Sequence, residues 1–219
     1  MIKRVFDLYI ERSEFFITLL MQHLTITAIS VSLITVIGLF FGVLMIKNRL
    51  FANVVLRTTS FLYTIPSIAL FGILVSITGI GLRSAIIAIV LYGVLPMIRM
   101  TYTGLMEVDD EIIESATGMG STETQLLLRI RFPLALPVIF SGFRTMVVMT
   151  IALGAIASFI GAGGLGQAIW RGISTNFPEM TLAGSLLVAF SAILIDLLLE
   201  QVEKMIRMKY LGEKGEKHA

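Results

Sequence analysis

Three ionisable side chains interrupt otherwise apolar stretches of the sequence: Arg99, Arg144 and Asp196. Each lies six to seven residues from the nearest polar boundary, roughly 9–10 Å inside its stretch if that stretch is helical. A charge at such a depth is costly alone, so it should pair or face water. We therefore predict a buried charge network in which Asp196 neutralises Arg144 or Arg99. The alternative is that the two arginines extend toward the nearest water.

The other reactive residue types do not combine into a catalytic or metal site. No nucleophile is accompanied by an activating base or a metal pair, so we expect no catalytic residue. His23 has no His, Asp or Cys partner at ligand spacing, and the chain has no cysteine. We interpret His23 as a polar cap at the outer end of the first apolar stretch, and we expect no metal.

Two glycine-rich patterns imitate nucleotide-binding loops without their context. Gly161-x-Gly163-Gly164-x-Gly166 follows an apolar stretch, whereas a dinucleotide loop needs a preceding strand and a βαβ unit. No Gly-Lys-Ser/Thr sequence occurs either, so a phosphate-binding P-loop is absent. We expect this chain to bind neither a dinucleotide nor ATP.

The composition is that of an integral membrane protein. Of 219 residues, 56% are hydrophobic and only 15% charged, and the mean hydropathy is +0.91. The pattern predicts an all-α, polytopic domain over residues 22–203, after an amphipathic outer-surface segment (1–21) and before a basic tail (204–219). The five expected spans are Gln22–Ile46, Val54–Ile77, Arg83–Leu105, Pro137–Ile160 and Thr181–Val202.

The placement of Lys and Arg predicts the orientation in the bilayer. A net charge of +2 gives no reason to expect a nucleic-acid partner. With the C-terminus inside, twelve basic residues fall on the cytoplasmic side and five outside, as the positive-inside rule requires. The inner set is Lys47, Arg49, Arg57, Arg99, Arg129, Arg131, Arg144, Lys204, Arg207, Lys209, Lys214 and Lys217; the outer set is Lys3, Arg4, Arg12, Arg83 and Arg171.

The longest polar interruption, residues 106–136, lies between spans three and four on the inner side. Acidic residues at its start favour a helix N-terminus, and Gly118 and Gly120 favour a helix stop. Thr122 and Gln125 then have the spacing of a capping box, which opens a second helix that Pro133 is expected to end. Two short helices bent about a glycine turn predict a docking element.

This segment resembles the cytoplasmic signature of permease subunits of ATP-binding-cassette importers, E-A-A-x3-G-x9-I-x-L-P. Glu114, Ser115, Ala116, Gly120, Ile130, Phe132 and Pro133 fall at that spacing, with Ser115 and Phe132 replacing an Ala and the Leu. The resemblance implies the type I importer permease fold and identifies residues 106–136 as a coupling segment for an ATPase. Glu114, Ser115, Ala116, Gly118, Gly120, Ile130 and Pro133 would carry the coupling.

Three further patterns resemble the osmoprotectant branch of that family, whose substrates are glycine betaine, carnitine, choline and related quaternary amines. They are Thr64-Ile65-Pro66-Ser67, Leu91-Tyr92-Gly93-Val94-Leu95-Pro96 and the run Phe159–Gly166. The resemblance implies ATPase subunits that bind ATP and Mg, a second permease chain (identical or paralogous) and an extracytoplasmic binding protein. It also implies location in the cell membrane. A permease for methionine or another amino acid remains the alternative, and a secondary transporter, which would have more spans and inverted repeats, is an alternative of another class.

Candidate path residues lie in spans two and three. Tyr63 and Tyr92 fall near the middle of the bilayer, where aromatic faces attract a quaternary ammonium, although mid-span tyrosines also serve in packing. Pro66 and Pro96 free backbone carbonyls, which favours either a translocation path or a packing kink. The glycines at 161, 163, 164 and 166 are expected to form an outer loop facing the binding protein, or else a passive turn.

Overall fold

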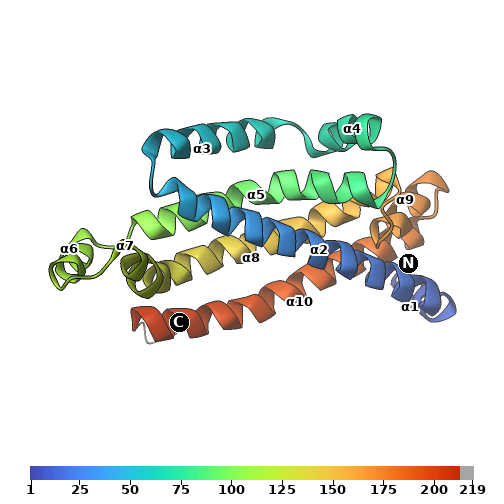
Figure 1. The fold of residues 1–219 in the computed structure, drawn as a ribbon. Helices are drawn as coiled ribbons and strands as arrows, with labels where there is room; N and C mark the ends of the chain where they lie inside the picture. Colours follow the sequence, from blue (N-terminus) through green and yellow to red (C-terminus); the bar gives the residue numbers. More distant parts are fainter. Residues whose placement is uncertain (213–219) are drawn as a thin grey trace.

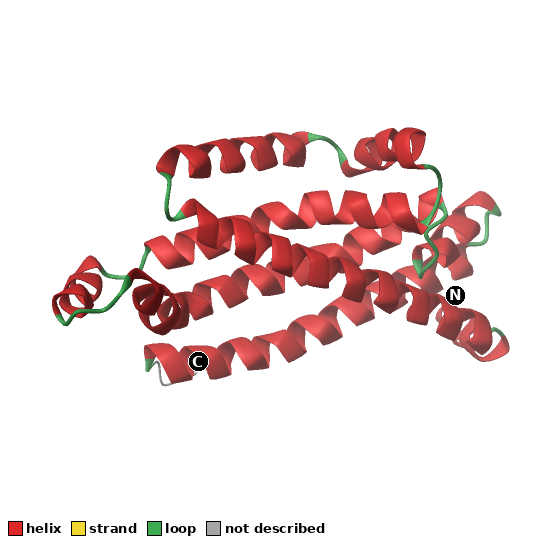
Figure 2. Ribbon diagram, viewed as in Figure 1, coloured by secondary structure: helices red, strands yellow, loops and turns green. Residues whose placement is uncertain are grey.

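The computed structural model describes residues 1–212, which form helices joined by short loops, with no strand in that range (Figure 2). The helices are α1 (Ile2–Glu11), α2 (Ser13–Met45), α3 (Arg49–Thr64), α4 (Ser67–Thr78), α5 (Leu82–Met106), α6 (Asp110–Gly118), α7 (Glu123–Gln125), the π-helix η1 (Leu126–Arg131), α8 (Phe132–Ala157), the 3-10 turn η2 (Ser158–Ile160), α9 (Gly166–Ser174) and α10 (Pro178–Leu211).

Four helical stretches are long and apolar enough to cross a bilayer: α2, α5, the continuous helix Glu123–Ile160 and α10. The helices α3 and α4, bent by 97° at their break, pass the same test only as a pair, which is the pattern of a broken span or of a re-entrant loop. Helices suit this environment because they satisfy their own backbone hydrogen bonds. The all-α, polytopic fold is therefore confirmed, with four spanning helices, or five if the bent pair is counted as one span.

Helix α5 lies at the centre and packs against both α2 and α8 (Figure 1). Small residues allow the close approach: a Cβ atom at Gly38 of α2 would lie 2.3 Å from Met97 Cγ. One turn further, a Cβ at Gly42 would lie 2.5 Å from Thr101 Cβ. Glycines four residues apart thus bring α2 against α5, as is common between membrane helices.

Span two differs from its prediction as one continuous span, because the helix breaks at Pro66. Ile65 has extended backbone angles (φ −69°, ψ 128°), and Pro66 becomes the N-cap of α4. The cause is local: a proline ring disfavours the helical conformation of the residue before it. Pro96 has a different outcome, since it lies inside the uninterrupted helix α5.

The chain termini also depart from the predicted boundaries. The helix that contains span one begins at Ser13, nine residues before the predicted span, and residues 204–211 of the predicted tail are helical, continuing α10. Lys214 and Lys217, assigned to that tail, lie outside the described residues. Helix α1 is partly built into the fold: Val5 and Leu8 are buried, and the Tyr9 hydroxyl donates to the Ala183 carbonyl at 2.8 Å.

Candidate coupling segment and translocation groove

The polar elements gather at the two opposite ends of the bundle (Figure 1). The α6 end carries α6, α7, the turn between α2 and α3, and the last turns of α10. The α9 end carries α1, α9 and the glycine segment 161–165. The N-terminus and the end of α10 therefore lie at different ends of the bundle.

Helix α6 is closed at both ends by its own residues. The Asp109 carboxylate accepts the Glu111 N–H at 2.9 Å, which caps the N-terminus. At the other end, the Gly120 N–H donates to Thr117 O at 2.9 Å and the Ser121 N–H to Ala116 O at 3.1 Å. This pair of bonds is a Schellman motif, which requires the left-handed φ of +86° found at Gly120. Gly120, and not Gly118, is the stop.

The predicted capping box at Thr122 is present. The Thr122 side chain accepts the Gln125 N–H, and the Gln125 side chain accepts the Thr122 N–H at 2.9 Å. The helix that it opens does not end at Pro133, contrary to the prediction. It widens into the π-helix η1, where the Phe132 N–H donates to Leu127 O, and continues as α8. A proline near the start of α8 is tolerated because this wider turn takes the place of the missing α-helical bond.

The coupling segment exposes some of its signature residues and buries others. Glu114, Ser115, Gly118 and Gly120 are exposed, Ala116 is only 2% exposed, and Ile130 and Pro133 are half-buried. Two large apolar side chains also face outward, Ile112 at 44% and Met119 at 82% exposure. Apolar side chains beside exposed acidic ones at the tip of a projecting helix are suited to contact with a partner protein.

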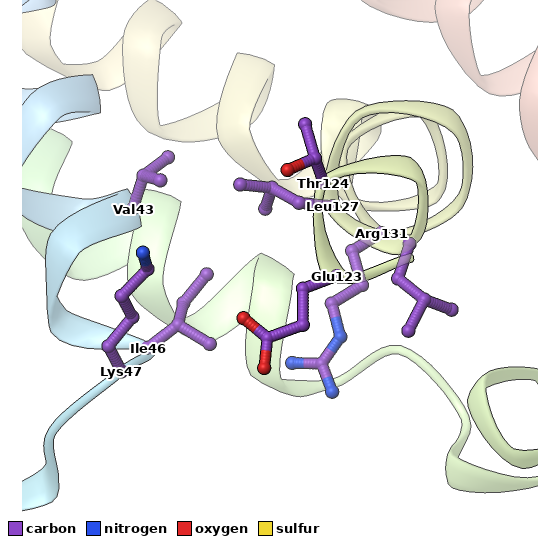
Figure 3. A pocket seen from close by; sticks show the side chains of 8 residues that line it. Val43, Ile46, Lys47, Glu123, Thr124, Leu127 and Arg131 are labelled. Atoms are coloured by element: carbon purple, nitrogen blue, oxygen red, sulfur yellow. The ribbon is translucent and has the colours of Figure 1, made fainter. Parts of the chain in front are cut away.

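A cavity of about 360 Å³ separates the end of α2 from α7 and η1 (Figure 3). Lys47 lies on one side, and Glu123 and Arg131 lie on the other, with Val43 and Leu127 along the apolar wall. The sequence does not predict this cavity, because Lys47 and Glu123 are far apart in the chain and no local pattern shows that their segments lie opposite each other.

Arg144 of α8 is neutralised by one face of α10. Its guanidinium bonds both Asp196 carboxylate oxygens, at 2.5 and 2.8 Å, and also contacts Glu203 at 3.2 Å and Glu200 at 3.4 Å. Asp196 is therefore the partner of Arg144, one of the two predicted choices. The two glutamates were missed, although their spacing of four and seven residues from Asp196 places them on the same helical face.

Arg99 does not join this network, which corrects the prediction of one cluster. Its only hydrogen bond among residues 1–212 is to the Ser60 hydroxyl, at 3.2 Å. It lines a separate groove of about 330 Å³ between α3, α5 and α8. The lining residues are Ser60, Tyr63, Leu95, Pro96, Arg99, Met100, Gly142 and Thr145.

Two of the four candidate path residues, Tyr63 and Pro96, line that groove. Tyr92 lies directly behind Tyr63: the ring centroids are 5.6 Å apart, and Tyr92 is 7% exposed with its hydroxyl unpaired in the described structure. Pro66 is not among the lining residues, because it sits at the break between α3 and α4. The structure thus brings the two tyrosines together with Pro96 and Arg99.

The glycine segment is packed, not an open loop. Gly163, Gly164 and Gly166 are buried and only Gly161 is exposed, which corrects the expectation that all four face a binding protein. The Gln22 side chain accepts the Gly164 N–H at 3.0 Å, and the Ser158 hydroxyl donates to Gly163 O at 2.5 Å. Trp170 is among the exposed side chains at this end, and its ring lies 5.0 Å from that of Phe159.

His23 is also placed differently from its prediction as a polar cap. It is fully buried within α2, where it contacts Gly154 of α8 and Gly164 of the glycine segment. Neither ring nitrogen makes a hydrogen bond of normal geometry within the described chain. In residues 1–212, no three His, Asp or Glu side chains lie close enough together to hold a metal ion.

A helical bundle with a capped, projecting coupling segment defines a membrane component of a multi-subunit transporter. The profile of the family described as "Binding-protein-dependent transport system inner membrane component" matches residues 34–208. The chain belongs to this family of importer permeases, which spans the membrane several times and works with ATPase and substrate-binding partners.

Three relatives illustrate the similarity. The "Osmoprotectant import permease protein OsmW" of Salmonella typhimurium is 40% identical, over 91% of this chain and 95% of its own length. The "Glycine betaine/carnitine/choline transport system permease protein OpuCD" of Bacillus subtilis is 36% identical, over 84% and 81%. The "Ergothioneine transport permease/ergothioneine binding protein EgtU" of Helicobacter pylori is 43% identical over 77% of this chain, which spans only 31% of that relative.

A solved structure supports the fold. The chain of the MetNI methionine ABC transporter in inward-facing conformations superposes with a TM-score of 0.76, over 87% of this chain and 95% of that one. The two sequences are 24% identical, so the likeness concerns the architecture alone.

Proposed function

We propose that this chain is the permease subunit of an ATP-driven importer for a quaternary-amine osmoprotectant such as glycine betaine, carnitine or choline. The observation that carries the proposal is the coupling segment: a short, doubly capped helix with exposed acidic and apolar residues projects from one end of a membrane bundle. A site of this kind transmits force to a partner and performs no chemistry of its own. ATP and Mg are bound by the partner ATPase.

The orientation follows from the charges at the two ends. The α2–α3 turn, which contains Lys47, belongs to the α6 end, and η1, which contains Arg129 and Arg131, directly follows α7 there. Helices α1 and α9, which contain Arg4 and Arg171, belong to the α9 end. We place the α6 end in the cytoplasm and the N-terminus outside, in agreement with the positive-inside rule. Two permease chains, identical or paralogous, then enclose the path, and two ATPase subunits dock on residues 106–136.

The substrate class rests on what different relatives have in common. Glycine betaine, carnitine, choline and ergothioneine all carry a trimethylammonium group, although their other groups differ. The groove of this chain presents the ring of Tyr63, and an aromatic face attracts such a cation without binding it tightly. We infer that the shared cation, and not methionine or another ordinary amino acid, is the feature that this permease accommodates.

The test is purification of the chain from its native membrane, identification of copurifying subunits, and uptake by the reconstituted complex. We expect an ATPase and a binding protein to copurify, and ATP-dependent uptake of labelled glycine betaine, carnitine or choline. Copurification with no ATPase, or uptake of methionine in place of all three, would contradict the proposal.

Ergothioneine is the second candidate substrate, because the relative with 43% identity is named for it. It should therefore be included as a competitor in the same uptake experiment. Inhibition by ergothioneine at concentrations well below those of glycine betaine or choline would assign it as the main substrate.

A further inference from the structure

The two arginines of the apolar helices have opposite surroundings: Arg144 is partly buried, whereas Arg99 is exposed in the single chain. Arg144 contacts three carboxylates, whereas Arg99 has no acidic partner in residues 1–212 and bonds only the Ser60 hydroxyl. A guanidinium carries five N–H donors arranged as a fork that matches a carboxylate, so one hydroxyl leaves most of its capacity unused. Because Arg99 is exposed, its remaining donors face either water or a ligand.

The groove that Arg99 lines also contains an aromatic surface. Tyr63 lines the same groove from α3 and is 45% exposed, and the ring of Tyr92 lies behind it at 5.6 Å. The hydroxyl of Tyr63 is turned to the Met149 sulfur, at 3.5 Å. One site therefore offers a donor fork for an anion and an electron-rich ring for a cation.

We propose, on the basis of the proposed function, that this groove is a substrate-reading site in the permease itself and that it prefers zwitterionic betaines to choline. The Arg99 guanidinium receives the substrate carboxylate, and Tyr63, backed by Tyr92, receives the trimethylammonium group. Choline carries a hydroxyl in place of the carboxylate, so it meets only the aromatic part. The substrate is then selected a second time, in the permease, after the binding protein has released it.

The test is direct binding of labelled glycine betaine and of choline to the permease–ATPase complex in lipid nanodiscs, with no binding protein present. We expect the wild-type complex to bind glycine betaine more tightly. Arg99→Gln should weaken glycine betaine binding by about tenfold or more, because a charge-assisted bidentate bond is lost, and should leave choline within about twofold. Tyr63→Leu should weaken both ligands, whereas Tyr63→Phe should weaken neither.

Arg57→Gln is the matched control, because Arg57 is an exposed arginine of α3 that does not line the groove. It should bind both ligands as the wild type does. If Arg99→Gln does not assemble with the ATPase, Arg99→Lys keeps the charge but removes the fork, and a selective loss of glycine betaine binding is still expected.

Three results would overturn the inference: no glycine betaine binding by the wild-type complex, unchanged binding by the Arg99 variants, or an equal loss for glycine betaine and choline. Uptake by the complete importer is measured in parallel. Transport of glycine betaine without a permease site refutes this inference and leaves the proposed function standing. Absence of any quaternary-amine transport refutes the proposed function.

Discussion

The two ends of the bundle use glycine for opposite purposes. At the α9 end, glycines provide space: a Cβ atom at Gly166 would lie 1.9 Å from Ala155 O, and one at Gly172 would lie 2.4 Å from Thr181 N. At the α6 end, a Cβ at Gly118 or Gly120 would meet no atom within 4 Å. There Gly120 is needed for its backbone angle alone. The surroundings of α9 are thus closely packed, whereas the tip of α6 is open.

The largest effect should come from filling the space at the α9 end. Gly166→Ala places a methyl group against the backbone of α8, which cannot yield as a flexible side chain would, so overpacking should cost about 3 kcal/mol or more. We expect little folded protein in the membrane, measured by the yield of monodisperse protein after detergent extraction. Gly72→Ala is the control, since a Cβ there meets nothing within 4 Å; equal yields of the two variants would refute the packing argument.

Gly120→Val should act at the α6 end without unfolding the bundle. A β-branched residue at φ +86° is strained, so the Schellman turn reorganises and the coupling segment changes shape. We expect uptake by the reconstituted importer to fall about tenfold, with a melting temperature within a few degrees of the wild type. Gly118→Ala, in ordinary helical conformation, keeps the turn and should lower uptake much less. Normal uptake by Gly120→Val would contradict the coupling role.

Between the two ends, Asp196→Asn tests the polar link from α10 to α8. It removes a charged partner of Arg144, whose remaining contacts to Glu203 and Glu200 are longer, so we expect a loss of about 2 kcal/mol in the free energy of unfolding. Thermal unfolding in detergent measures it. Glu200→Gln should lower the free energy of unfolding by less, since Glu200 lies 3.4 Å from Arg144. A larger loss for Glu200→Gln than for Asp196→Asn would contradict the assignment of Asp196 as the main partner of Arg144.

The smallest effect is expected from Thr122→Ala, which removes half of the capping box at the α6 end. Loss of an N-cap typically costs about 1 kcal/mol, and here the loss should remain local because α7 is exposed. Hydrogen exchange at residues 123–126 should accelerate several-fold, with no change at the α9 end. A change in exchange at both ends would mean that they are not structurally independent.

The features that could be predicted from sequence depend on neighbours along the chain. The stop at Gly120 and the capping box at Thr122 follow from residues three or four apart, and the spans follow from composition. The ion pair between Arg144 and Asp196 could be predicted because a charge within an apolar helix needs a partner of opposite charge. Glu203 could have been added from the helical spacing alone.

The errors concern contacts between distant segments. The glycines after Ile160 suggested an open loop, but Gln22 and His23 of α2 cover them, and no local pattern reveals which helix lies opposite. Depth in the apolar stretches groups Arg99 with Asp196, whereas the hydrogen-bond partner of Arg99 in the structure is Ser60 of α3. Pro133 was treated as a stop, because a π-turn that accommodates proline has no simple sequence signature.

The absence of a stop at Pro133 has a mechanical consequence. Residues Glu123–Ile160 form one rod of 38 residues, about 57 Å long at the rise of an α-helix. Such a rod is nearly twice the thickness of the hydrocarbon layer, about 30 Å. A tilt of about 5° around its midpoint would displace each tip by roughly 2.5 Å. A push on the tip at the α6 end that tilts this helix as one body therefore moves its other end, at Ile160, by a similar distance.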